Sequence, residues 1–104
     1  MIVEERTYHV YTGKLAELTR VYEAEGTGVQ QEILGRLIGA FTTDIGQLSC
    51  FVQIWAYDDF DDRSTRRARL AADPRWQAFL PKITPLIHTQ HNRILVPTPF
   101  SPLR

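Results

Sequence analysis

The chain has few cysteines, no excess of charge and no long apolar run among its 104 residues. Its single cysteine, Cys50, cannot form an internal disulfide, so the fold depends on its core. Because 12 basic residues balance 12 acidic ones, no overall field draws the protein to nucleic acid or to an anionic membrane. No apolar run approaches the roughly 20 residues that a membrane-spanning helix requires.

Other familiar signals are also missing. Charges interrupt the first residues, MIVEERTYHV, where a signal peptide needs an apolar stretch, so we expect a cytoplasmic protein. The sequence has no P-loop, no G-x-G-x-x-G and no G-x-S-x-G, which disfavours nucleotide cofactors and serine-hydrolase chemistry. We expect no cofactor. A hydrophobic content of 43% suits one domain spanning residues 1–104, with a proline-rich tail at 97–104.

The order of predicted elements indicates an α+β fold. The first half is expected to contain a strand at 2–10, a helix at 14–26, a polar connection at 25–32 and strands within 34–44 and 48–58. In the second half we expect a helix that starts within Asp58 to Asp62 and is broken at Asp73-Pro74, and a last strand at 92–96. Aspartates at a helix start cap backbone N–H groups, and two Asp/Arg pairs, Asp59/Arg63 and Asp62/Arg66, stand four residues apart. This order predicts a ferredoxin-like βαββαβ fold, a four-stranded antiparallel sheet with both helices on one face.

The other face of that sheet would be uncovered. In the third predicted strand, Cys50, Val52, Ile54 and Ala56 share one face and Phe51, Trp55 and Tyr57 share the other, so both faces are apolar. An exposed apolar face predicts a partner, most simply a second copy packed sheet to sheet.

Four stretches resemble the NIPSNAP domain. They are RTY at 6–8, LGRLIGAFTTDIG at 34–46, WAYDDFDDRSTRRARLAADPRWQAFL at 55–80, and QHNRILVPTPFSP at 90–102. The resemblance implies a fold of the dimeric α/β-barrel superfamily, in which two sheets associate into a barrel with the helices outside. Relatives in that superfamily include cofactor-independent monooxygenases and small-molecule isomerases, but no biochemical activity is established for NIPSNAP proteins themselves. The resemblance therefore implies a fold and not a reaction.

Two arginines occupy unusual positions on the predicted third helix. Arg67 falls inside its apolar stripe and Arg63 lies at the edge of that stripe. An unpaired buried guanidinium costs several kcal/mol, so Arg67 must extend to solvent, pair with an acid such as Glu4, or face an anionic ligand. Both arginines also match the R-x-x-x-R positions of the NIPSNAP pattern, which does not say what they bind.

Four further residues are candidates for ligand contact. Arg6 and Tyr8 share a face of the first strand and could flank a small polar ligand or anchor the dimer. Trp55 and Tyr57 could wall a cavity, but we favour a place for them on the intersubunit face. Trp76, by contrast, has the spacing of a core residue with Phe79.

The three histidines predict no metal site. His88 and His91 are three residues apart in HTQH, a spacing that a strand would separate, and only His9 and Cys50 are plausible additions. His9 and His88 remain possible acid–base groups, but no pattern in the sequence arranges them. Cys50 is expected to be an inert core residue.

The leading hypothesis is a homodimer whose sheet and helices enclose a pocket for a small organic molecule. An acid group of that molecule would meet Arg63 or Arg67, and any reaction would proceed without a cofactor. The alternative is a non-catalytic interaction or scaffold protein, in which arginines and aromatics serve the dimer and a further protein partner. A sizeable pocket with convergent polar groups would favour the first hypothesis, and a filled core the second.

Overall fold

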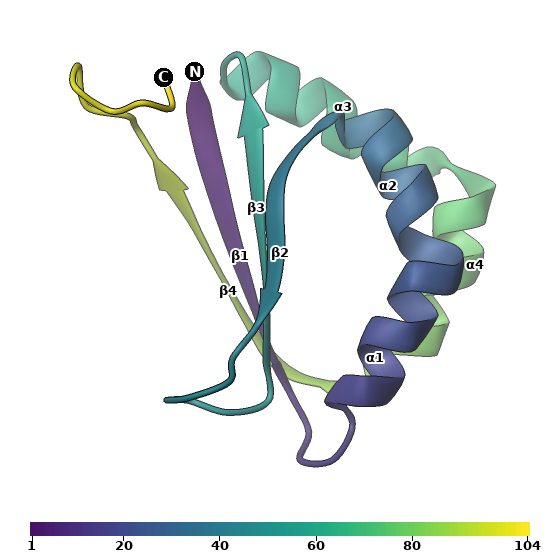
Figure 1. Cartoon of the computed structure of the whole chain (residues 1–104). Helices are drawn as coiled ribbons and strands as arrows, with labels where there is room; N and C mark the ends of the chain where they lie inside the picture. The colour runs from purple at the N-terminus through teal and green to yellow at the C-terminus, as the bar shows by residue number, and fades with distance from the viewer.

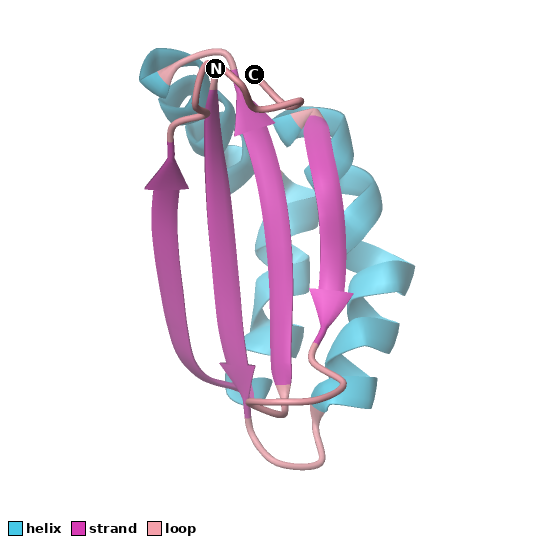
Figure 2. Ribbon diagram, turned by 60° about the vertical axis from the view of Figure 1, so that its left-hand side comes forward, coloured by secondary structure: helices cyan, strands magenta, loops and turns pink.

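The computed structural model describes all residues, 1–104, as one sheet covered on one face by helices (Figure 1). Its elements are β1 (Ile2–Val10), α1 (Leu15–Val21), a π-helical turn η1 (Tyr22–Gly26), α2 (Thr27–Leu34), β2 (Arg36–Thr42), β3 (Cys50–Tyr57), α3 (Phe60–Ala72), α4 (Pro74–Ile83), a 3₁₀ turn η2 (Thr84–Leu86) and β4 (Ile87–Leu95). The strand order is β2-β3-β1-β4 with every neighbour antiparallel, and the helices lie behind the sheet in Figure 2. The predicted ferredoxin-like fold is confirmed.

Alternation along β1 and β3 divides the sheet into a helix face and an open face. On β3, Phe51, Trp55 and Tyr57 are buried beneath the helices and belong to the main core. On β1, the helix face carries Tyr8 but also two charged residues, Glu4 and Arg6, both of which are buried. The imperfect alternation of the first strand therefore brings charge into the interior.

Two element boundaries differ from the prediction. The segment expected to be a polar connection is helical, because η1 carries the chain past Gly26 and Val29 and Ile33 of α2 supply an apolar face that packs into the core. Gly26 does not stop the helix; it lets the ring of Phe79 approach, since a Cβ there would stand 2.4 Å from that ring. The last strand starts at Ile87 and not at Asn92, because pairing with β1 orders residues whose own sequence is polar.

The aspartates of the loop before α3 act mainly as caps. The Asp59 carboxylate accepts a hydrogen bond of 2.7 Å from the backbone N–H of Asp62, and Asp62 forms an ion pair of 2.8 Å with Arg66. Of the two expected pairs on this helix, Asp62/Arg66 is confirmed. Asp59/Arg63 is wrong, because Arg63 turns inward to a different carboxylate. No helix has the length and apolar character needed to cross a bilayer.

Candidate ligand-binding site

Glu4 is the centre of a buried charged network on the helix face of the sheet. It is 0% exposed, and both of its oxygens accept hydrogen bonds. Arg63 donates from Nε to Oε1 at 3.2 Å and from Nη2 to Oε2 at 2.7 Å, Arg6 donates from Nη1 to Oε2 at 3.0 Å, and Asn92 donates from Nδ2 to Oε2 at 3.1 Å. These bonds satisfy the carboxylate in the interior, which a buried charge requires.

The network keeps Glu4 ionised. Burial alone would raise the pKa of its carboxyl, but the hydrogen bond from Arg63 and the charges of Arg6, Arg63 and Arg67 hold that pKa below its ordinary value. One carboxylate therefore lies among three guanidinium groups. Arg6 also donates from Nε to the Tyr8 hydroxyl at 3.0 Å, which fixes it on the strand.

Arg67, one turn beyond Arg63 on α3, has no ion pair. Its Nη1 atom is buried and has no hydrogen-bond partner, and the same is true of the Tyr57 hydroxyl. The two groups adjoin each other without reaching hydrogen-bonding geometry: burial raises the pKa of Tyr57, and the charge and the N–H groups of Arg67 oppose that rise. Arg67 as a whole is half-buried, so this one buried nitrogen is the part of its guanidinium that lacks a partner.

A cavity of about 450 Å³ opens beside this charge, between the sheet and helices α3 and α4. Arg6 and Tyr8 of β1 and Arg67 of α3 form its polar part. The remaining lining residues come from five elements and are mostly apolar: Tyr22, Ala71, Trp76, Leu80, Ile83, Thr84, Ile87 and Gln90. The volume lies in the range typical of small-molecule sites, and a few polar groups in an apolar cavity are typical of their lining.

Three of the six predicted ligand contacts, Arg6, Tyr8 and Arg67, therefore meet at one cavity. The other three lie outside its lining. Arg63 is engaged by Glu4. Trp55 and Tyr57 are both 0% exposed beneath the helices, so the favoured placement on an intersubunit face was wrong. The two residues lie on the face of β3 that the helices cover.

Tyr22 is a cavity residue that the sequence did not single out. Its side chain is 4% exposed, and its hydroxyl has no hydrogen-bond partner. In the sequence, Tyr22 looks like one member of an apolar helical stripe. The signal that distinguishes it is structural, because it begins η1, and π-helical turns occur frequently at functional sites.

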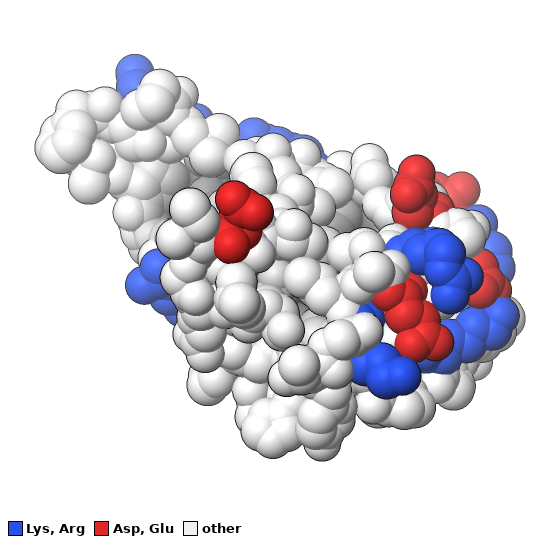
Figure 3. Space-filling view, turned by 60° about the horizontal axis from the view of Figure 1, so that its bottom comes forward, with Lys and Arg blue, Asp and Glu red and all other residues white.

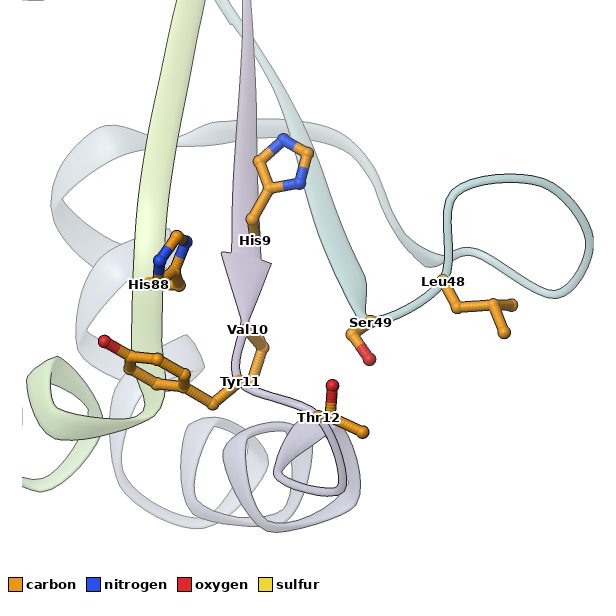
Figure 4. Close-up of a pocket in the computed structure, with 7 residues that line it drawn as sticks. All are labelled: His9, Val10, Tyr11, Thr12, Leu48, Ser49 and His88. Carbon is orange, nitrogen blue, oxygen red and sulfur yellow. The ribbon is translucent and has the colours of Figure 1, made fainter.

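A second cavity, of about 480 Å³, lies at the end of the sheet near the β2–β3 connection. Figure 4 shows Tyr11 beside His88 in this cavity, with Leu48 and Ser49 across from them. Its seven lining residues include no Lys, Arg, Asp or Glu, and Figure 3 shows few such residues at this end of the molecule away from the helices. The cavity between sheet and helices is therefore the better candidate for an ionic ligand.

The histidines lie near one another without forming a metal site. The rings of His9 and His91 are 5.1 Å apart, and His9 Nδ1 lies 3.4 Å from the Cys50 sulfur. No group of three or more His, Cys, Asp and Glu side chains has an arrangement that could hold a metal ion. His88 is directed to Tyr11 instead, with ring centroids 5.0 Å apart.

Residues 3–102 match the family model of NIPSNAP. The chain belongs to the NIPSNAP family. It is 31% identical over 103 residues to mouse protein NipSnap homolog 2 and 30% identical over 103 residues to zebrafish protein NipSnap homolog 1. Each match covers 99% of this chain but 36% of the relative, so the chain spans about a third of the length of these NipSnap proteins.

Solved structures of NIPSNAP proteins match the chain over its whole length. A NIPSNAP family protein from Agrobacterium tumefaciens superimposes with a TM-score of 0.97 at 52% identity, covering 99% of this chain and 98% of that one. An uncharacterized NIPSNAP domain protein from Burkholderia xenovorans gives 0.94 at 46%, covering 98% and 99%. An antibiotic biosynthesis monooxygenase gives 0.66 at 11%, covering 95% and 100%, and shares the fold alone. None of these matches establishes an activity for this NIPSNAP chain.

Proposed function

We propose that this NIPSNAP domain binds a small organic acid in the cavity between the sheet and helices α3 and α4. The observation that carries the proposal is Arg67, which has a buried Nη1 without a partner and lines a cavity together with Arg6. A carboxylate there would supply the partner that Arg67 lacks, in the planar geometry that suits a guanidinium.

The balance of charges supports an anionic ligand. Glu4 accepts hydrogen bonds from Arg6 and Arg63, while Arg67 has none. A ligand without an acceptor would leave the buried Nη1 of Arg67 without a partner, which is costly. The apolar part of the lining, with Trp76, Ile83 and Ile87, suits an apolar body attached to the acid group.

The competing function, an interaction or scaffold module, needs no cavity of this kind. In that case arginines and aromatics would gather on an exposed surface or fill the core completely. Arg67 and Arg6 converge instead on an interior space of about 450 Å³. This convergence favours ligand binding over the scaffold function.

The proposal includes a homodimer formed through the open face of the sheet. That face carries half-buried Val52 and Ile54, and Phe41 is 55% exposed. Its charges, Glu5 and Arg93, form an ion pair of 2.9 Å across the strands, so the face is already neutralised and suits a copy of itself. Light scattering should find a dimer for the wild type and a monomer for Ile54→Arg; an Ile54→Arg protein that remains dimeric would place the contact elsewhere.

A binding titration tests the acid site. With 4-isopropylbenzoate as the probe, the wild type should bind and Arg67→Leu should lose binding at least about tenfold, the size of a charge-assisted hydrogen bond. Arg69→Leu makes the same change at an exposed position of α3 and serves as the control. Unchanged affinity in Arg67→Leu, together with raised stability, would exclude the acid site. Native mass spectra of freshly purified protein would report the subunit count and any acid retained through purification.

A further inference from the structure

Tyr22 holds a buried hydrogen-bonding group that neither the core nor the Glu4 network uses. Its side chain is 4% exposed, its hydroxyl has no partner, and it lines the same cavity as Arg6 and Arg67. A buried hydroxyl without a partner is destabilising, so its presence requires an explanation.

The ring of Tyr22 cannot turn away to find a partner elsewhere. Its centroid lies 5.1 Å from that of Phe51, 4.9 Å from that of Phe79 and 6.3 Å from that of Trp76, so three aromatic neighbours surround it. The backbone is also constrained, because Gly26, at the other end of η1, packs directly against the Phe79 ring. The hydroxyl is therefore held in one place.

Two buried amides, Gln30 and Gln53, lie next to this hydroxyl and partly oppose the rise of its pKa, but neither stands in hydrogen-bonding geometry to it. Gln30 Nε2 donates to Gln53 Oε1 at 3.3 Å, and Gln53 Nε2 donates to Gln30 Oε1 at 3.0 Å, so the two amides bond to each other. The indole of Trp55 also donates to Gln53 Oε1, at 3.3 Å. These bonds join the amides to each other and to the indole, and none of them includes the hydroxyl of Tyr22, a residue that lines the cavity.

We propose that the Tyr22 hydroxyl is a second polar contact of the ligand, so that the ligand is an apolar carboxylic acid bearing a separate acceptor oxygen. The inference rests on the acid site proposed above and makes it more specific. The carboxylate lies at Arg67, and a carbonyl, hydroxyl or ether oxygen elsewhere on the molecule accepts a hydrogen bond from Tyr22.

Tyr22 serves here as a donor. Burial raises the pKa of its hydroxyl, and the nearby Tyr8 adds to the rise, while Gln30, Arg6 and Gln53 oppose it only in part. The phenol therefore keeps its proton at neutral pH. A site built around a fixed donor rejects ligands that lack the matching acceptor, because the donor then remains buried and unpaired.

Matched probes separate this contact from simple acid binding. In 4-acetylbenzoate and 4-isopropylbenzoate a carbonyl oxygen replaces a methyl group at nearly constant shape, and the 3-substituted isomers place the same pair at another position on the ring. We expect one of these pairs to bind the wild type with a preference of about five- to tenfold for the acetyl member, the size of one hydrogen bond. Tyr22→Phe should abolish that preference while keeping the affinity for the isopropyl member.

Tyr57→Phe is the matched control. It removes another buried hydroxyl without a partner, but one that does not line the cavity. It should keep the acetyl preference, and both Phe variants should fold, because each loses only an unsatisfied group.

The outcomes distinguish the two proposals. If no benzoate binds, or if binding is independent of Arg67, the acid site itself fails and the inference fails with it. If binding depends on Arg67 but neither pair of isomers is discriminated, or if Tyr22→Phe keeps the preference, the inference about Tyr22 alone is overturned. A preference that Tyr57→Phe also abolishes would overturn it too, since the effect would then not belong to the cavity.

Discussion

Arg63 and Arg67 stand one turn apart on α3, and the structure gives them different roles. Arg63 reaches Glu4 through two hydrogen bonds and is part of the framework that joins α3 to β1. Arg67 makes no ion pair, has a buried Nη1 without a partner and borders the cavity. The comparison shows that the same residue type, repeated at helical spacing, can be paired at one position and remain unpaired at the next.

The largest effect on stability is expected from removing Glu4, the acid that both Arg6 and Arg63 bind. Glu4→Ala leaves the buried Arg6 and the partly exposed Arg63 without their carboxylate, so the free energy of unfolding should fall by about 3 to 5 kcal/mol in chemical denaturation. Glu17→Ala breaks an exposed pair with Lys14 on the helical side of the molecule and should cost about 1 kcal/mol or less. Equal effects of the two substitutions would show that the Glu4 network is not structural.

The second test compares the two arginines directly. Arg63→Leu should lower the free energy of unfolding by about 2 to 3 kcal/mol, because it takes two hydrogen bonds from a fully buried carboxylate, although Arg63 itself is partly exposed. Arg67→Leu should leave stability unchanged or raise it within about 1 kcal/mol, since it removes an unpaired buried donor. A large loss of stability in Arg67→Leu would assign Arg67 to the framework as well.

A third test disturbs the cavity wall through η1. Gly26→Ala places a Cβ 2.4 Å from the Phe79 ring, so it should cost about 1 to 2 kcal/mol by overpacking and should weaken ligand binding by displacing Tyr22. Gly28→Ala adds a methyl group in open space in α2 and should stabilise by about 0.5 to 1 kcal/mol. Thermal unfolding of the pair measures the difference, and equal shifts would contradict the close packing at Gly26.

The smallest effect concerns pH. The pKa of Glu4 is lower in the folded protein than its ordinary value, so its contribution to stability is present above that ordinary value, near pH 4.5, and is lost as the pH falls through the folded pKa. The unfolding free energy of the wild type should therefore decline below about pH 4.5, with a smaller decline in Glu4→Gln. Asp73, whose pKa Arg75 lowers to about 2, adds loss in the same direction, so Glu4→Gln keeps part of the slope. Identical slopes would show that Glu4 does not titrate in this range.

The sequence predicts the fold better than it predicts the candidate site. Alternation, turn residues and capping aspartates are local signals, and they correctly predict the βαββαβ order and the inward placement of Arg67. The partner of Glu4 is not local: Arg63 lies 59 positions away, and helical spacing alone cannot decide which of two inward arginines reaches the acid. Nor does any local pattern reveal that Tyr22 begins a π-helical turn, since Val29 and Ile33, beyond two glycines, determine whether the helix continues.

The position of β1 has a consequence for how the chain folds. The first strand pairs with β3 and with the last strand, β4, so its two neighbours come from the middle and the end of the sequence. Contacts this distant close large loops, and folds that depend on them form slowly compared with helical bundles. During synthesis β1 leaves the ribosome first, but Glu4 reaches Asn92, 88 positions later, only when β4 has emerged. The earliest strand to be made is therefore the last to be completed.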